Sequence, residues 1–192
     1  MLLRILVVAG VYVLVTLGAT NAGAQSNPVV VVETSMGNIT IELFQDRAPI
    51  SVENFLAYVN DGFYAGTVFH RVMQQFMIQG GGMTADLTPK QTRDPIKNEA
   101  TNGISNERGT IAMARTNVVD SATAQFFINT VNNRRSLDNT GTDARSYGYA
   151  VFGRVTDGMD VVDQIAAVQT RSQGQHQNVP VEPIVIEGVT VK

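Results

Sequence analysis

The chain alternates short apolar runs with polar connections, and many of these runs are rich in β-branched residues. Runs of this length between turn-forming residues predict β-strands. The predicted strands cover residues 29–34, 38–44, 69–73, 76–78, 109–114, 125–131, 150–155 and 184–191. Many short strands with few helices favour an all-β sandwich or barrel.

Two segments have helical spacing instead. The first has Ser51 as its predicted N-cap and ends at Asp61-Gly62. The second covers residues 159–167, where apolar side chains form one stripe. Three polar stretches are predicted to be loops, namely residues 85–108, 132–147 and 169–179.

Residues 69–82, reading FHRVMQQFMIQGGG, are the stretch around which the rest is organised. Two apolar runs flank Gln74-Gln75, which predicts a β-hairpin. Because alternate strand residues share a face, Met77 and Gln79 are expected on one face, with Phe76 and Ile78 on the other. A charged residue inside the first run, Arg71, indicates that the hairpin lines a groove.

The run at residues 125–131 shows the same mixed pattern. Gln125 and Phe127 are expected to share one face, which leaves Phe126 and Ile128 for the core. In both runs one face pairs an apolar side chain with an amide. Such a surface suits a pocket that holds a ring and the polar backbone beside it.

Composition excludes several classes of function. The chain has 192 residues, 44% of them hydrophobic, which suits one well-formed domain. It has no cysteine, so disulfides, thiol catalysis and cysteine-bound metals are excluded. Two histidines are too few for a metal site, and a net charge of −3 offers no field to attract nucleic acid.

The first 24 residues resemble a secretory signal peptide. Arg4 precedes an apolar run from residue 5 to residue 17, and Ala22-Gly23-Ala24 forms a small-x-small cleavage pattern. We therefore expect cleavage after Ala24 and a periplasmic or secreted protein without stable membrane association. An uncleaved membrane anchor is the alternative, although the run is short against the roughly 20 residues that span a bilayer.

Residues 29–192 form the predicted domain, and their motifs resemble the cyclophilin-type peptidyl-prolyl cis-trans isomerases. The resemblance rests on four segments, FHRVMQQFMIQGGG at 69–82, GTIAMART at 109–116, AQFFINT at 124–130 and YAVFGRVTDGMDVVDQI at 149–165. It implies a mainly β fold, a closed eight-stranded antiparallel barrel capped by two helices. It also implies a cofactor-free monomer that isomerises X-Pro bonds in proline-containing peptides and in unfolded or folding proteins.

The same resemblance assigns roles to individual residues. Arg71 is the expected catalytic group, since a guanidinium stays protonated and can stabilise a transition state without transferring a proton. His70 is expected to be a structural histidine that faces away from Arg71 and whose ring nitrogens have hydrogen-bond partners. The expected substrate-binding residues are Phe76, Met77, Gln79, Ala114, Arg115, Gln125, Phe127, Leu137 and Tyr149. For Ala114 and Arg115 the resemblance implies contacts through backbone groups.

Two positions depart from the family pattern. Ser136 stands where many members have Trp, which predicts weak inhibition by cyclosporin, and Tyr149 stands where many have His. These departures leave a second hypothesis open, a catalytically weak module or chaperone that binds proline peptides on the same barrel. A third hypothesis, a membrane-tethered interaction protein, depends on retention of the first 24 residues.

Overall fold

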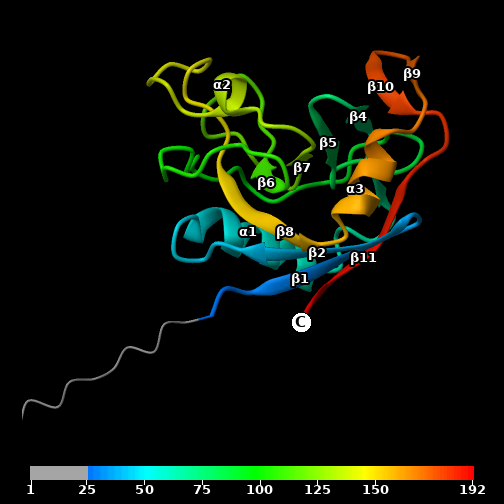
Figure 1. Ribbon diagram of the computed structural model, residues 1–192, viewed down its shortest axis with the longest axis horizontal. Coiled ribbons are helices and arrows are strands. Elements are labelled where there is room, and N and C mark those ends of the chain that lie inside the picture. Colours follow the sequence, from blue (N-terminus) through cyan, green and yellow to red (C-terminus); the bar gives the residue numbers. More distant parts are fainter. Residues whose placement is uncertain (1–25) are drawn as a thin grey trace, which may run out of the picture.

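The computed structural model describes residues 26–192, so the predicted signal peptide lies outside the described residues. Figure 1 shows a sheet wrapped around a core, with helices packed against it. None of the helices within residues 26–192 is both long and apolar enough to cross a bilayer.

Within residues 26–192, nine strands form one antiparallel sheet and two form a separate hairpin. The strands are β1 (Val29–Thr34), β2 (Gly37–Leu43), β3 (Thr67–Val68), β4 (Arg71–Met73), β5 (Met77–Gly80), β6 (Thr110–Met113), β7 (Phe126–Asn129), β8 (Val151–Asp157), β9 (Thr170–Gln173), β10 (His176–Pro180) and β11 (Val185–Val191). The order in the large sheet is β3-β11-β1-β2-β8-β6-β7-β5-β4. All eight predicted strands are present, with ends shifted by a few residues.

The prediction of a closed eight-stranded barrel is wrong. The two edge strands of the sheet, β3 and β4, follow each other in the chain with only Phe69 and His70 between them. The sheet therefore curls strongly until its edges approach, but no β-ladder joins those edges. Between β3 and β4, the Phe69 amide donates to the carbonyl oxygen of Ile184, the residue before β11, at 3.0 Å, which extends the pairing of β3 with β11. The result is an open half-barrel.

Helices were predicted at two places, and the described part of the chain has three. The first, α1 (Pro49–Asn60), and the third, α3 (Met159–Ala166), occupy the predicted segments. A short helix, α2 (Arg134–Leu137), lies in the stretch predicted to be a loop. Its four residues are too few to show a helical period in the sequence.

The hairpin of β9 and β10 was also missed, because residues 169–179 were predicted to be a loop. Its strands read TRSQ and HQNVP, and most of their side chains are exposed or half-buried. Such strands carry no alternation of apolar and polar residues, so no strand pattern is visible in this part of the sequence. Figure 1 shows the hairpin projecting beside α3.

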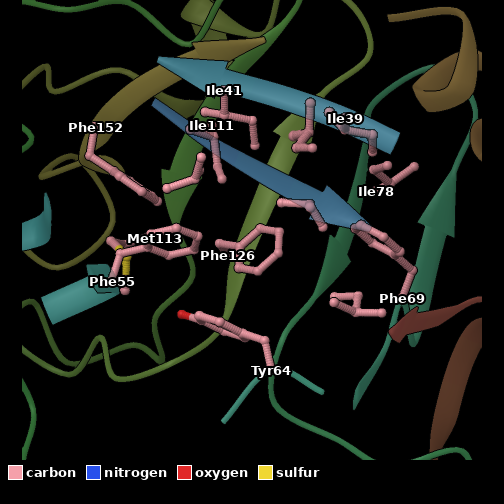
Figure 2. Packing of buried hydrophobic residues seen from close by; sticks show 14 of the residues in the cluster. Ile39, Ile41, Phe55, Tyr64, Phe69, Ile78, Ile111, Met113, Phe126 and Phe152 are labelled. Atoms are coloured by element: carbon pink, nitrogen blue, oxygen red, sulfur yellow. The ribbon is translucent and has the colours of Figure 1, made fainter. Parts of the chain in front are cut away.

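Alternation along the central strands separates two hydrophobic clusters. In β7, Phe126 and Ile128 enter the main core while Phe127 points to the opposite face, as predicted. In β6, Ile111 is likewise in the main core and Ala112 on the other face. Figure 2 shows the main core, where side chains of α1 and of several strands meet. The second cluster consists of Met77, Ala112, Phe127, Leu137 and Val151.

Helix α1 begins differently from the prediction. Its N-cap is Ala48, which has no side chain to cap with, and Ser51 is the third helical residue. The cap comes instead from Glu99, whose carboxylate accepts bonds from the backbone amides of Ile50 (3.0 Å) and Ser51 (2.7 Å). The Ser51 hydroxyl donates to it as well, at 2.7 Å. A negative group at this end also complements the helix dipole.

Replacing Glu99 with alanine should lower the free energy of unfolding by about 1–2 kcal/mol, the usual effect of losing an N-terminal cap. Glu99→Gln keeps a hydrogen-bond acceptor, so its free energy of unfolding should decrease less. Urea unfolding measures both variants. The matched control is Glu107→Ala, because Glu107 is exposed and its side chain makes no hydrogen bond within residues 26–192. An equal loss in the control would contradict capping by Glu99.

Candidate active site

Strand pairing places the predicted site residues in one row across the sheet. Arg71 on β4 lies opposite Gln79 on β5, and Gln79 lies opposite Phe127 on β7. Phe127 in turn lies opposite Ala112 on β6. Directly paired residues share a face of the sheet, so the cation, the amide and the aromatic ring point to the same side. That side is the one opposite the main core.

A hollow of about 110 Å³ opens on this face, and we call it the groove. Its lining combines one apolar wall with two arginines and an amide. The lining residues are Arg71, Phe76, Met77, Gln79, Ala114, Arg115, Phe127, Leu137 and Tyr149. The remaining predicted residue, Gln125, lines an adjoining hollow of about 140 Å³. The structure therefore brings all of the predicted site residues together.

The position of Phe76 corrects the alternation argument. That argument placed Phe76 on the core face, opposite Met77. Phe76 instead belongs to the turn before β5 and packs, half-buried, against the second cluster. The period of two does not extend into a turn, so Phe76 can join Met77 in the groove wall.

Arg71 is half-buried at the rim of the groove. Its Nη1 donates to Gln79 Oε1 at 3.4 Å, and Gln79 Nε2 donates to Gln125 Oε1 at 2.9 Å. The three ion pairs found within residues 26–192 involve other arginines. The Arg71 guanidinium is thus oriented by a neutral amide, and its charge is not neutralised by a carboxylate in that part of the chain.

The glycines after β5 make room for side chains of the site. A Cβ at Gly82 would overlap the Gln125 side chain, and one at Gly81 would lie 2.7 Å from the Phe126 ring. Gly81 also has a φ of +80°, which side chains rarely tolerate. The sequence left two roles equally open for residues 80–82, a bulge or close approach of substrate. In the structure they allow close approach of the protein's own side chains.

A network of buried asparagines supports the groove, and the sequence analysis missed it. Asn129 Nδ2 donates to Asn106 Oδ1 at 3.2 Å, and Asn133 Nδ2 donates to Asn129 Oδ1 at 2.8 Å. All three residues are buried. A buried amide must find partners, so each of these side chains fixes the segments that it joins.

The network reaches three walls of the groove through backbone oxygens. Asn133 Nδ2 donates to the Phe76 carbonyl oxygen at 2.7 Å. Asn106 Nδ2 donates to the carbonyl oxygens of Leu137 and Tyr149, both at 3.2 Å. Asn106 and Asn133 lie in loops and Asn129 ends β7, and isolated Asn residues give no periodic signal that could have revealed the network.

A metal centre is not indicated in the described part of the chain. Residues 26–192 contain no cluster of three His, Cys, Asp or Glu side chains suited to a metal ion. A larger hollow of about 360 Å³ lies between the β4–β5 turn, the end of α3 and β10. Its lining has no charged side chain, so the combination of a cation with an apolar wall belongs to the smaller groove.

Comparison with known families identifies this arrangement. Residues 29–191 match the family model described as cyclophilin type peptidyl-prolyl cis-trans isomerase/CLD. The chain belongs to the cyclophilin-type peptidyl-prolyl cis-trans isomerases. The catalysed reaction is therefore rotation about the peptide bond that precedes proline.

Cyclophilin-type relatives in bacteria are similar over nearly their whole length. A peptidyl-prolyl cis-trans isomerase of Acinetobacter baylyi is 55% identical over 172 residues, which cover 90% of this chain and 89% of the relative. Peptidyl-prolyl cis-trans isomerase B of Escherichia coli is 53% identical over 163 residues, which cover 85% of this chain and 99% of the relative. A crystal structure of a Cryptosporidium parvum cyclophilin has the same fold, with a TM-score of 0.69 at 22% identity. The match covers 86% of this chain and 98% of the Cryptosporidium chain.

This cyclophilin buries a histidine directly before the groove arginine. His70 is 6% exposed and lines a different hollow from Arg71, so it faces away as predicted. Its Nδ1 has no hydrogen-bond partner within residues 26–192, which corrects the expectation of a fully satisfied side chain. Burial lowers the pKa of His70 to about 4, although a hydrogen bond to the Val68 backbone offsets part of this shift.

The buried histidine makes the isomerase sensitive to acid. The folded chain binds this proton more weakly than the unfolded chain, whose His pKa is about 6.5. The contribution of neutral, buried His70 to the free energy of unfolding is therefore complete above pH 6.5 and is lost as the pH falls towards 4. When the pH falls from 7 to 4.5, the free energy of unfolding of His70→Gln should therefore decrease by about 2 kcal/mol less than that of wild type.

Urea unfolding at the two pH values measures this difference. His176→Gln is the matched control, since it removes the other histidine, which lies half-buried on β10. His176 also contributes to the lowered pKa of His70, but burial is the larger cause, so this variant should keep most of the wild-type loss. Equal losses in wild type and His70→Gln would show that His70 does not carry the acid sensitivity.

Proposed function

We propose that Arg71 is the catalytic group of this isomerase and that the groove binds the proline. One observation carries the proposal: a guanidinium without a carboxylate partner in the described chain stands at the rim of an apolar hollow. A partly desolvated cation that is free to donate interacts more strongly with a developing acceptor than one held in an ion pair.

The reaction requires such an acceptor and little else. Rotation about an X-Pro bond has a barrier near 20 kcal/mol and takes tens to hundreds of seconds without a catalyst. Twisting the bond breaks amide resonance and localises a lone pair on the proline nitrogen. A donor aimed at that nitrogen stabilises the twisted state selectively. Lowering the barrier by about 4 kcal/mol brings the rate to roughly 10 per second.

The other residues of the groove hold the substrate. Phe76, Met77 and Phe127 offer an apolar surface for the proline ring. The amides of Gln79 and Gln125 bind the neighbouring backbone, and Gln79 also orients Arg71. A related observation concerns another protein: the Cryptosporidium parvum cyclophilin has a crystal structure in the presence of the dipeptide Ala-Pro.

Arg71→Ala should lower kcat/KM for a short X-Pro peptide by roughly 100-fold, the usual effect of removing one donor to a transition state. Arg71→Lys keeps the charge but loses the planar donor geometry, so we expect an intermediate activity. Exchange spectroscopy on the peptide measures the cis-trans rate with catalytic amounts of each protein. Circular dichroism checks that the variants are folded.

The matched control is Arg134→Ala, because Arg134 is exposed on α2 and does not line the groove. It should retain the wild-type rate. A folded Arg71→Ala with wild-type activity would refute the catalytic role. If wild type binds the peptide without accelerating exchange, the domain is a binding module.

We also propose that the isomerase acts outside the cytoplasm and assists the folding of exported proteins. The apolar run at residues 5–17 followed by Ala22-Gly23-Ala24 supports this. A proline isomer in a newly exported chain can limit the rate of folding, so an isomerase is useful there.

Expression of the full chain in a Gram-negative host, followed by intact mass of the periplasmic fraction, tests the export proposal. The expected mass is that of a chain beginning at Gln25. Ala22→Lys and Ala24→Lys should together block cleavage, because the signal peptidase requires small residues there. A full-length mass in the membrane fraction of the wild type would support the anchor instead.

A further inference from the structure

Beside the groove lies a second hollow of about 140 Å³, which we call the side pocket. Its lining residues are Gln79, Ala114, Arg115, Thr116, Ser121, Thr123 and Gln125. Three of them, Gln79, Ala114 and Arg115, also line the groove. The two hollows thus share a wall, so a peptide bound in the groove can place a neighbouring side chain in the side pocket.

Arg115 is the charged member of this lining, and its side chain is held firmly. Nε donates to the Gly148 carbonyl oxygen at 2.9 Å, and Nη2 donates to that of Ala144 at 2.8 Å. Nη1 donates to the Thr116 carbonyl oxygen at 2.9 Å. Cζ lies 4.8 Å from the centroid of the Tyr149 ring, within the range of a cation–π contact.

These contacts fix the guanidinium without neutralising it. All three hydrogen-bond partners of Arg115 are neutral carbonyl oxygens, and the ion pairs of residues 26–192 involve other arginines. The acid nearest to the pocket in sequence, Asp120, accepts a bond from the Asn98 amide at 2.9 Å. Three of the five guanidinium N–H groups are used, which leaves two for a ligand.

The neutral groups of the side pocket also favour an acceptor. Gln125 Oε1 accepts from Gln79 Nε2, so the Gln125 amide nitrogen is the group left to donate. The Ser121 hydroxyl is occupied, because it donates to the Val118 carbonyl oxygen at 2.7 Å and accepts from Thr116. A pocket that presents a cation and an amide N–H, and no carboxylate in its lining, complements an anion.

We propose that the side pocket binds the carboxylate of an Asp or Glu side chain in the substrate, with Arg115 as the residue that determines this specificity. The acidic residue lies close in sequence to the X-Pro bond held in the groove. This inference rests on the proposed function, since the groove must hold the proline. It adds a side-chain role for Arg115 to the backbone contacts that the family resemblance implies.

The test uses a series of alanine-based peptides with one proline, in which Glu or the isosteric Gln occupies each of the three positions on either side of the X-Pro pair. Peptide titration followed by NMR gives the dissociation constants, and exchange spectroscopy gives kcat/KM. At one position, Glu should bind wild type about fivefold more tightly than Gln, as expected for a half-exposed charge-assisted hydrogen bond. Arg115→Gln should reduce this ratio to about one.

Two control variants separate the local effect from others. Arg135→Gln removes an equal charge from an exposed site on α2 and should keep the fivefold preference. Thr123→Asp places a carboxylate in the side pocket without removing the bonds of Arg115, so it should abolish the preference. Its matched partner, Thr123→Asn, is neutral and should keep it. This pair preserves the test if Arg115→Gln fails to fold.

Equal affinities for the Glu and Gln peptides at every position would overturn the inference. A preference that survives in both Arg115→Gln and Thr123→Asp would overturn it too. Failure of the proposed function looks different: no peptide would isomerise faster with wild type, whereas the ratio of dissociation constants would still report on the side pocket.

Discussion

The alternation of side chains across β5, β7, β6 and β8 is the constraint on which both core and site depend. These strands have no solvent-facing side in the middle of the sheet, because one face packs the main core and the other packs the second cluster. A shift of register by one residue in β7 would exchange Phe126 with Phe127 and so damage both faces at once. The stability of the fold and the shape of the groove are therefore linked through the same backbone ladder.

Polar groups at the site have two kinds of hydrogen-bond partner. The buried amides of Asn106, Asn129 and Asn133 satisfy one another and fix the segments around the groove. Arg71 and Arg115, in contrast, are oriented by neutral oxygens that do not cancel their charge. The first arrangement provides rigidity, and the second keeps two cations available beside an apolar surface. This combination suits a reaction that needs stabilisation of charge and no covalent chemistry.

The sequence predicted those parts of the fold that have a clear period. Short apolar runs located eight of the eleven strands within residues 26–192, and the alternation correctly put Met77 and Gln79 on one face, where both line the groove. It could not locate the hairpin of β9 and β10, whose residues are mostly polar. The capping of α1 by Glu99 and the asparagine network depend on residues distant in the chain, which no local pattern reveals. Individual site roles came from the family resemblance, which for Arg115 concerned only backbone groups.

The capping of α1 by Glu99 also links the helix to a distant part of the chain. Glu99 and Ser51 are 48 residues apart, so the first turn of the helix acquires its acceptor only after the intervening hairpin and long loop have closed. A helix of this length is marginal by itself in water. The capped first turn of α1 therefore requires closure of the chain between Ser51 and Glu99, although the helix itself precedes most of the sheet in sequence.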